Sequence, residues 1–398
     1  MKYLLFTNPT GGWFPSMTDD KLLQLNLFRT QLADFKEKVA PHTAPDVKDL
    51  VEVLEQSLTE RRDVMAGEAS VHRPGVYQWH EAFNKGKDTG EVRHTMNLAP
   101  MDLEKYDIIH INGCGADVDL LPQVKQALGS SSIPVIFNLD YAIENWQQGF
   151  AKVDGFFKTL SMADFVFAVE PGQQALLNYC LKQVIRPKRE RVNVPVIPHP
   201  CDVQRLSANI VPREEQLDRI IICFHRYDKH IYIPACVTWD LEAYHPTVPF
   251  KAIRVPVYLA NIFGATGLPM HIHFFDGFIT GKSWPFWIYE LAHSTIGMEY
   301  YSIHSHSRYP EEAACLGIPV VGTNLAHSIN TLHPYTSHSL LDFGGMRRSL
   351  QRLMGDEEFY DKCKNYALEH VKELDHQPSK MKLLFELNRW LVAEGKVK

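Results

Sequence analysis

Short apolar runs alternate with amphipathic segments along most of this chain. In the first half, apolar runs predict strands at 2–6, 108–111, 134–137, 165–169 and 194–197. Apolar residues at helical spacing predict helices at about 19–35, 46–62, 118–128 and 173–184. The stretch from about 66 to 100 has no clear period and predicts a long irregular insertion, which in a compact domain is often functional.

The same alternation returns in the second half. Apolar runs predict strands at 220–224, 271–275, 297–303 and 318–322, with a short helix at 311–315. Two helices follow, at 357–374 and 378–394, separated by a break at residues 376–378. Strands that alternate with helices form parallel sheets covered on both faces. The expected fold is therefore α/β, with two doubly wound sheets joined near residue 200 and a ligand-binding cleft at the carboxyl ends of their strands.

Length and charge agree with a two-domain globular protein. A chain of 398 residues exceeds one ordinary core, and its content of 45% hydrophobic and 22% charged residues is typical of globular proteins. The formal net charge of −6 does not favour a dedicated nucleic-acid binder. One basic cluster, at residues 186–191, is interpreted as a solvated loop.

The sequence favours a cytoplasmic protein. The N-terminal apolar run is too short for a signal peptide, and no stretch of about 18 apolar residues could span a bilayer. Seven scattered cysteines without a CxxC pair favour free thiols in a reducing compartment. We expect no transmembrane segment, while peripheral contact with a membrane stays compatible with the sequence.

The segment 307–323 carries the most specific chemistry. It opens with Ser307 and Arg308, continues into a helix and ends in the strand Gly-Ile-Pro-Val-Val. Unpaired amides at a helix start favour a bound phosphate. The carboxylate of Glu312, one turn into the helix, can accept hydrogen bonds from both hydroxyls of a ribose. A plain helix-turn-strand is the alternative reading.

This segment resembles the donor domain of the GT-B glycosyltransferases of group 1, or family 4-like, type. Their motif has a Glu, seven residues, and then Glu-Ala-x-Ala-Cys-Gly-x-Pro-Val-Val, which is similar to residues 312–321. The resemblance makes Glu312 the expected ribose ligand. The first Glu of the motif, which touches the donor sugar in retaining members, falls at His304. A histidine supplies no carboxylate, so the resemblance leaves retention and inversion open.

Two further segments resemble the same family. Arg226 and Lys229, after the strand at 220–224, are similar to the cations that neutralise the donor diphosphate as the glycosidic bond breaks. Their spacing is shorter than usual, and Lys229 is equally readable as a surface residue. Residues 195–206 are similar to the segment that ends the N-terminal domain, where Asp202 is expected to be structural.

The N-terminal half offers weaker candidates. Gly11 and Gly12 resemble the Gly-rich loop that faces the donor phosphates, although any tight turn would use such a pair. Asp140 ends a predicted strand and is the candidate base of an inverting enzyme, with a helix N-cap as the alternative. The expected donor-binding residues are thus Gly11, Gly12, Arg226, Lys229, His304, Ser307, Arg308 and Glu312, and the expected catalytic residues are Asp140, Arg226 and Lys229.

The histidine pairs at 271/273 and 304/306 could each share an ion, but no third ligand stands at a familiar spacing. We therefore predict core or cleft histidines, no metal site, and no cofactor beyond the donor.

The resemblance implies two Rossmann-like domains facing each other across a cleft. Residues 1–200 would bind the acceptor, 201–375 the nucleotide sugar, and 376–398 would form a helix that crosses back to the N-terminal domain. The expected function is transfer of a hexosyl unit from a nucleoside diphosphate sugar, most often UDP-linked, to an unidentified sugar, lipid-linked, small-molecule or DNA acceptor. Alternatives are a DNA-modifying glucosyltransferase of the phage type, a non-catalytic sugar-nucleotide-binding homologue, and a sugar-nucleotide epimerase on the same fold.

Overall fold

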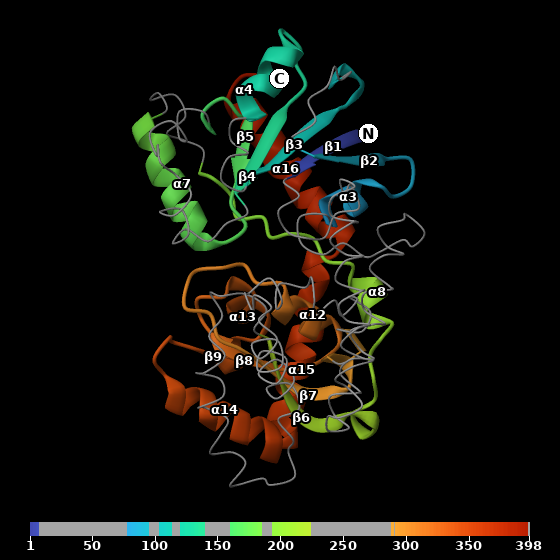
Figure 1. Cartoon of the computed structure of the whole chain (residues 1–398), viewed down its shortest axis with the longest axis vertical. Helices are drawn as coiled ribbons and strands as arrows, with labels where there is room; N and C mark the ends of the chain where they lie inside the picture. The colour runs from blue at the N-terminus through green and yellow to red at the C-terminus, as the bar shows by residue number, and fades with distance from the viewer. Residues whose placement is uncertain are drawn as a thin grey trace, which may run out of the picture. The chain divides into compact units, whose positions relative to one another are not determined.

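The chain forms two compact units. The computed structural model describes residues 1–7, 78–94, 103–113, 120–139, 160–184, 193–223, 288–289 and 291–396 (Figure 1). One unit contains Met1–Pro9, Pro74–Ile210 and Tyr301–Lys398, and the other contains Thr10–Arg73 and Val211–Tyr300. The domain boundaries predicted at 200/201 and 375/376 stay predictions.

The first unit holds a parallel sheet with the order β2-β1-β3-β4-β5. Its strands are β1 (Lys2–Thr7), β2 (Thr89–His94), β3 (Ile108–Gly113), β4 (Val135–Leu139) and β5 (Phe165–Phe167). This is the order of flavodoxin-like doubly wound sheets, whose ligands bind beyond the carboxyl ends of the strands at the switch point. The ends of β1 and β3, at Thr7 and Gly113, therefore mark the expected ligand edge.

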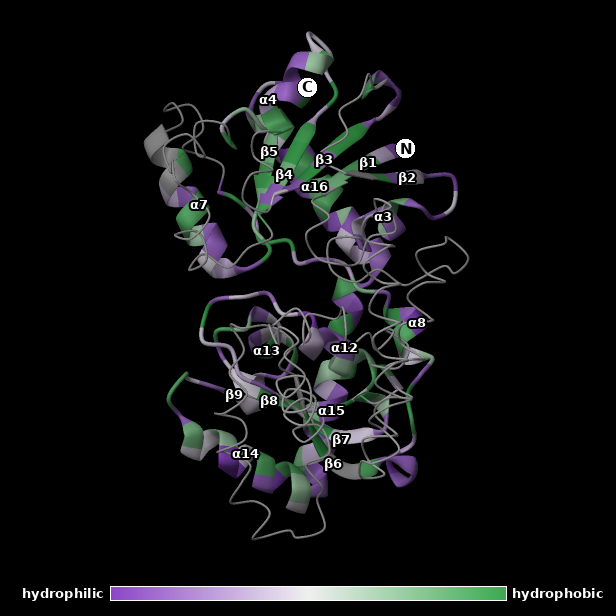
Figure 2. Ribbon diagram, in the orientation of Figure 1, coloured by the Kyte–Doolittle hydropathy of each residue, from purple (hydrophilic) through white to green (hydrophobic). Residues whose placement is uncertain are grey.

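The inner strands of this sheet are buried because their sequences are nearly continuous apolar runs. Every residue of β3, β4 and β5 is buried, and Figure 2 shows these strands mostly in green. His110 is a polar residue within the apolar run of β3. Its side chain is hydrogen-bonded, since its Nε2 lies 2.6 Å from Asn138 Oδ1. Gly113 is required at the end of β3, because a Cβ there would lie 2.2 Å from the Phe137 ring.

Helices and short strands make up the rest of the first unit. The α-helices are α3 (Gln78–Phe83), α4 (Leu120–Leu128), α7 (Pro171–Val184), α8 (Val203–Ser207), α12 (Tyr309–Cys315), α13 (His327–Leu332), α14 (Phe343–Gly355), α15 (Glu357–His370) and α16 (His376–Ala393). The 3-10 turns are η4 (Leu103–Lys105), η10 (Pro334–Thr336) and η11 (Val371–Leu374), and β8 (Val320–Thr323) pairs in parallel with β9 (Ser337–His338).

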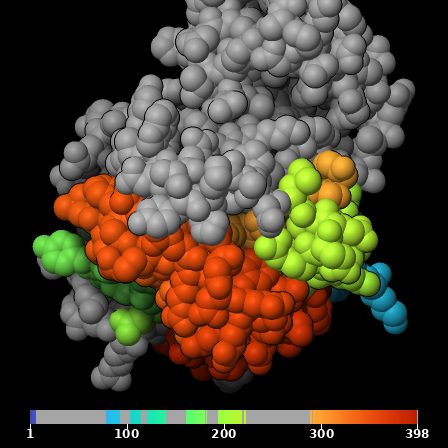
Figure 3. All heavy atoms as spheres, turned by 90° about the horizontal axis from the view of Figure 1, so that it is seen from below, coloured from blue at the N-terminus to red at the C-terminus, as the bar shows by residue number. Residues whose placement is uncertain are grey.

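Asp residues cap several of these helices. Asp342 and Asp356 accept the amide hydrogens of Gly345 and Phe359, which caps α14 and α15. Figure 3 shows these two helices, in orange-red, together on one face of the molecule. No described helix is both long and apolar enough to cross a membrane.

The last helix, α16, packs against the N-terminal part of the same unit. Trp390 meets Phe165 of β5 edge to face, with ring centroids 5.4 Å apart. His376 Nε2 lies 2.7 Å from Oε1 of Gln78, a residue 298 positions earlier in the chain. These contacts tie β5 and α3 to the C-terminal helix.

In the second unit, the described elements are η8 (Arg213–Glu215), β6 (Leu217–Cys223) and β7 (Ser294–Glu299), and β6 pairs in parallel with β7. Every residue of β7 is buried. The parallel pairing of β6 with β7 and the burial of β7 are typical of an α/β protein, as in the first unit.

Most of the predicted elements that lie in the described residues are present, with two corrections in the first half. Residues 194–197 do not form a strand, because only Val196 bridges Ala168 and the flanking prolines, Pro195 and Pro198, have no N–H to extend the ladder. The stretch 66–100 is not irregular throughout, since it contains α3 and β2.

Several boundaries in the second half also differ from prediction, among them the starts of α16 and β7. The helix α16 begins at His376, because Pro378 stands in the first turn, where a missing N–H costs nothing. The strand β7 begins three residues before the predicted start at 297. The helices predicted near the N-terminus and the strand predicted at 271–275 lie outside the described residues.

Candidate functional site

Four of the predicted donor-binding residues lie together in the first unit. His304, Ser307 and Arg308 form the loop before α12, and Glu312 lies in the first turn of that helix. The other predicted site residues lie outside the described residues: Gly11, Gly12, Asp140, Arg226 and Lys229.

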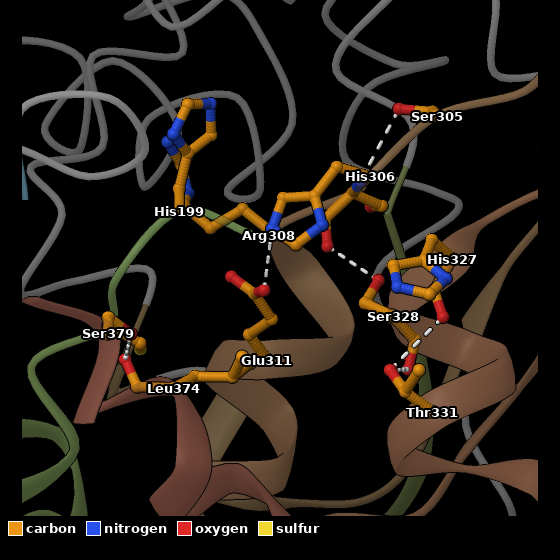
Figure 4. Close-up of polar contacts among 12 residues, drawn as sticks. His199, Ser305, His306, Arg308, Glu311, His327, Ser328, Thr331, Leu374 and Ser379 are labelled. Atoms are coloured by element: carbon orange, nitrogen blue, oxygen red, sulfur yellow. Dashed lines mark hydrogen bonds and ion pairs between the residues drawn. The ribbon is translucent and has the colours of Figure 1, made fainter. Parts of the chain in front are cut away.

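Ser307 holds the loop in a strained conformation. Its φ of 48° is in the left-handed region that non-glycine residues seldom adopt. Neighbouring groups fix this turn, because Ser328 Oγ donates to the Ser307 carbonyl at 2.6 Å and the Ser307 amide donates to Ser305 Oγ at 3.3 Å. The turn costs about 1–3 kcal/mol, so it persists only because α13 supports it (Figure 4).

Glu312 is a buried carboxylate that is paired with Arg308. Its side chain is 2% exposed, and its Oε1 lies 2.9 Å from Arg308 Nε. The Arg308 side chain is 33% exposed. The first turn of α12 therefore holds a buried carboxylate next to an arginine whose side chain is partly exposed.

A second polar arrangement, which sequence reasoning missed, leads to the same helix. Trp79 Nε1 donates to His199 Nδ1 at 3.2 Å. The rings of His199 and His306 meet edge to face at 5.8 Å, and His306 Nε2 lies 2.7 Å from Glu311 Oε1 (Figure 4). The last contact becomes an ion pair when the imidazole is protonated.

This arrangement could not be predicted from the linear sequence. His306 was visible as the partner of His304 in a two-residue spacing, but it was interpreted as a core or cleft residue. Trp79, His199 and Glu311 stand in separate segments, and only the tertiary fold brings their side chains together.

His327, at the start of α13, stays neutral beside this group. Burial and the nearby His306 lower the pKa of His327 to about 4, and the two rings are 6.4 Å apart. At neutral pH the loop before α12 is thus flanked by an uncharged imidazole on the side of α13.

His304 lies beside the start of α7. A Cβ built on Gly172 would lie 3.4 Å from His304 Cγ and 3.0 Å from a Glu170 carboxylate oxygen. Glu170 is buried and accepts the amide hydrogens of Gly172 and Gln173, both at 2.6 Å. His304 is exposed and lies next to the N-terminal turn of α7.

Neither a protein-family profile nor a curated protein sequence matches this chain. Solved structures do. An α,α-trehalose-6-phosphate synthase from Burkholderia multivorans superposes with a TM-score of 0.53 and 13% identity, over 75% of this chain and 73% of that one. A UDP-forming α,α-trehalose-phosphate synthase from Burkholderia xenovorans gives 0.51 and 12%, over 73% and 74%. A trehalose-6-phosphate structure from E. coli bound with UDP-2-fluoro glucose gives 0.53 and 11%, over 70% and 72%.

These likenesses, together with the parallel sheets, show the class of fold. The chain has the GT-B glycosyltransferase fold, and the prediction from the sequence is confirmed.

Proposed function

We propose that this protein is a glycosyltransferase that moves a hexosyl unit from a nucleoside diphosphate sugar, a UDP-sugar, to an acceptor. The observation that carries the proposal is the buried Glu312 in the first turn of α12, beside Arg308. It stands on a fold whose solved examples include a UDP-forming synthase and a structure bound with UDP-2-fluoro glucose.

In this proposal, each residue near α12 has a separate role in donor binding. Glu312 accepts hydrogen bonds from the ribose hydroxyls. The site therefore binds a nucleoside diphosphate sugar more tightly than a free sugar phosphate, which has no ribose. The exposed part of the Arg308 guanidinium faces anionic groups of the donor, and the Ser307 turn sets the direction of the loop. His304 occupies the place of a carboxylate that touches the donor sugar in retaining members of the family.

The residues outside the described part complete the mechanism that we propose. Arg226 and Lys229 stabilise the negative charge that grows on the departing diphosphate, and the transfer itself needs no metal ion. The Gly11-Gly12 backbone approaches the phosphates. If configuration is inverted, Asp140 takes the proton of the acceptor hydroxyl as it attacks the anomeric carbon. On the sequence criteria above, we place the enzyme in the cytoplasm.

One observation favours a second candidate function, that of a sugar-nucleotide-binding protein without transfer activity. Position 304 carries an exposed imidazole where the family motif has a carboxylate. Release of UDP from UDP-glucose, with or without acceptor, separates the two functions, because a binder alone would leave the donor intact.

A thermal-shift screen tests the proposal directly. Nucleotide sugars with UDP, GDP and ADP are added to the purified protein, and a true donor raises the melting temperature in proportion to its occupancy. We expect a UDP-sugar to give the largest shift, and UDP release to follow with the same sugar. If no nucleotide sugar shifts the melting temperature and none is consumed, the proposed function is wrong.

A further inference from the structure

Two carboxylates and one buried imidazole converge where α8 and α16 begin. One ligand atom from each of Asp202, Asp375 and His376 lies within 4.8 Å of the other two. Asp202 precedes α8, and Asp375 precedes α16. The backbone already joins these two points, since Cys201 bridges Asp375 and the Cys201 amide donates to the Leu374 carbonyl at 2.8 Å.

The imidazole of His376 is oriented as that of a metal ligand. The side chain is 1% exposed, and its Nε2 bonds to Gln78 Oε1 at 2.7 Å. A neutral ring that donates from Nε2 presents a bare lone pair at Nδ1, and within the described part of the chain Nδ1 is buried without a hydrogen-bond partner. Metal-bound histidines commonly donate their other nitrogen to an oxygen in this way.

One oxygen of the Asp375 carboxylate also lacks a hydrogen bond. Asp375 stands at the N-cap of α16, the position where an Asp normally caps its helix, yet its side chain makes no capping hydrogen bond. Its Oδ1 is buried and has no hydrogen-bond partner among the described residues. Three carboxylates, those of Asp202, Asp375 and Glu81, and the cation of Lys85 lie near enough to interact electrostatically with the His376 ring.

We propose that Asp202, Asp375 and His376 bind a divalent transition-metal ion of the Zn²⁺ type. One imidazole and two carboxylates are a donor set for Zn²⁺, whereas Mg²⁺ and Ca²⁺ prefer oxygen ligands alone. Zn–N and Zn–O bonds of about 2.0–2.2 Å place neighbouring tetrahedral ligand atoms about 3.3 Å apart. The ligand atoms therefore draw closer when the ion binds, and water fills the fourth position.

The ion is structural. It fastens the start of α8 to the start of α16 and takes no part in sugar transfer, so it is independent of the proposed function. It replaces the sequence-based expectation that the chain has no metal site. Asp202 and Asp375 are 173 positions apart in the printed sequence, and no spacing rule would have joined them.

The first test uses the full chain without an affinity tag, stripped of metal with a chelator. Zn²⁺ is titrated by calorimetry, and the melting temperature is followed in parallel. We expect one equivalent to bind at this site. At 100 times its dissociation constant, the ion should raise the folded-to-unfolded ratio about 100-fold. A melting temperature that does not respond to Zn²⁺, or that responds equally to Mg²⁺, would overturn the assignment.

Variants locate the site among the 19 histidines of the chain. Asp375→Asn and Asp202→Asn keep the side-chain shape, and Asn retains the capping role of Asp202. Each should weaken Zn²⁺ binding by at least about tenfold and remove one equivalent. Asp356→Asn, at the N-cap of α15, is the matched control and should bind as the wild type does. Unchanged stoichiometry and affinity in both site variants would refute the proposal, even if His376→Gln failed to fold.

Discussion

At the scale of single residues, the candidate site depends most on Glu312. Its carboxylate is buried beside Arg308 rather than exposed on the helix surface. A buried carboxylate is costly unless it is paired, and Arg308 supplies that pairing here. In the proposed function, the same carboxylate binds the ribose of the donor.

The first prediction concerns this carboxylate. Glu312→Gln should weaken UDP binding by about 1–3 kcal/mol, because an amide accepts hydrogen bonds less strongly than a carboxylate and can accept through only one oxygen. Isothermal titration calorimetry with UDP measures the change. Glu357→Gln, an exposed first-turn glutamate in α15, is the control and should bind UDP normally. Equal affinities in the two variants would remove Glu312 from the site.

A second prediction separates binding from chemistry. Arg226→Ala should lower kcat more than it raises KM for the donor, because its cation is needed most when charge develops on the leaving diphosphate. Steady-state kinetics with UDP-glucose give both constants. A loss confined to KM would assign Arg226 to ground-state binding only.

The site could be predicted from the sequence only where its residues are neighbours in the chain. Ser307, Arg308 and Glu312 belong to one loop and one helix turn, so a linear motif contains them. The contacts of His306 with His199 and Glu311 depend on how separate segments pack, and no periodicity encodes them. The left-handed turn at Ser307 was equally hidden, because serine gives no sign of a positive φ.

At the scale of elements, a buried histidine connects α12 to the strand that follows it. His333 Nε2 donates to the Pro310 carbonyl at 2.9 Å, and its Nδ1 accepts the Val320 amide hydrogen at 3.3 Å. Only the second bond needs the neutral ring, because a protonated Nδ1 cannot accept a hydrogen bond. Burial is the main reason that the pKa of His333 falls to about 4.

This linkage predicts a pH dependence of stability. An unfolded histidine has a pKa near 6.5, so between about pH 6.5 and 4 the unfolded chain binds more protons than the folded one. The free energy of unfolding should therefore fall as the pH falls through this window, by about 3 kcal/mol for His333 alone. Urea unfolding at several pH values measures the slope.

The variant His333→Gln checks the origin of that slope. It should be less stable than the wild type at pH 7 and should lose less stability on acidification, with the remaining dependence due to other groups such as His327. A slope as steep as that of the wild type would show that His333 is not responsible.

Elements were predictable where burial dictates the sequence pattern. The runs in β3, β4 and β5 are apolar because both faces of these strands are covered. The strand β2 was missed because it lies at the edge of the sheet and reads Thr-Gly-Glu-Val-Arg-His, with little apolar signal. Residues 194–197 were wrongly predicted to form a strand because they are apolar. The prolines in and beside this segment limit its pairing to one bridge.

At the scale of the whole molecule, α16 holds distant parts of the first unit together. Its Trp390 is 2% exposed against Phe165, and Lys380 forms a salt bridge with Asp88 on the turn before β2. The sequence predicted a helix here from its 3.6-residue period. It could not predict which residues from earlier in the chain the helix would contact.

Removal of the Trp390 ring should destabilise the first unit strongly. We expect Trp390→Ala to lower the free energy of unfolding by about 3–5 kcal/mol, the usual cost of a large aromatic side chain deleted from a core. Chemical unfolding measures the loss. Phe385→Ala, on the same helix but with its ring 65% exposed, should change stability by less than about 1 kcal/mol. Similar losses in both variants would contradict this account of α16.

The position of α16 also bears on how the protein is made. The strand β1 leaves the ribosome long before α16 does, yet both belong to one unit. The apolar surface of β5 that Trp390 covers therefore stays exposed until α16 has been translated. Nascent chains stalled before residue 376 should therefore recruit chaperones and be cut readily by protease, and this sensitivity should end abruptly once the last helix has emerged.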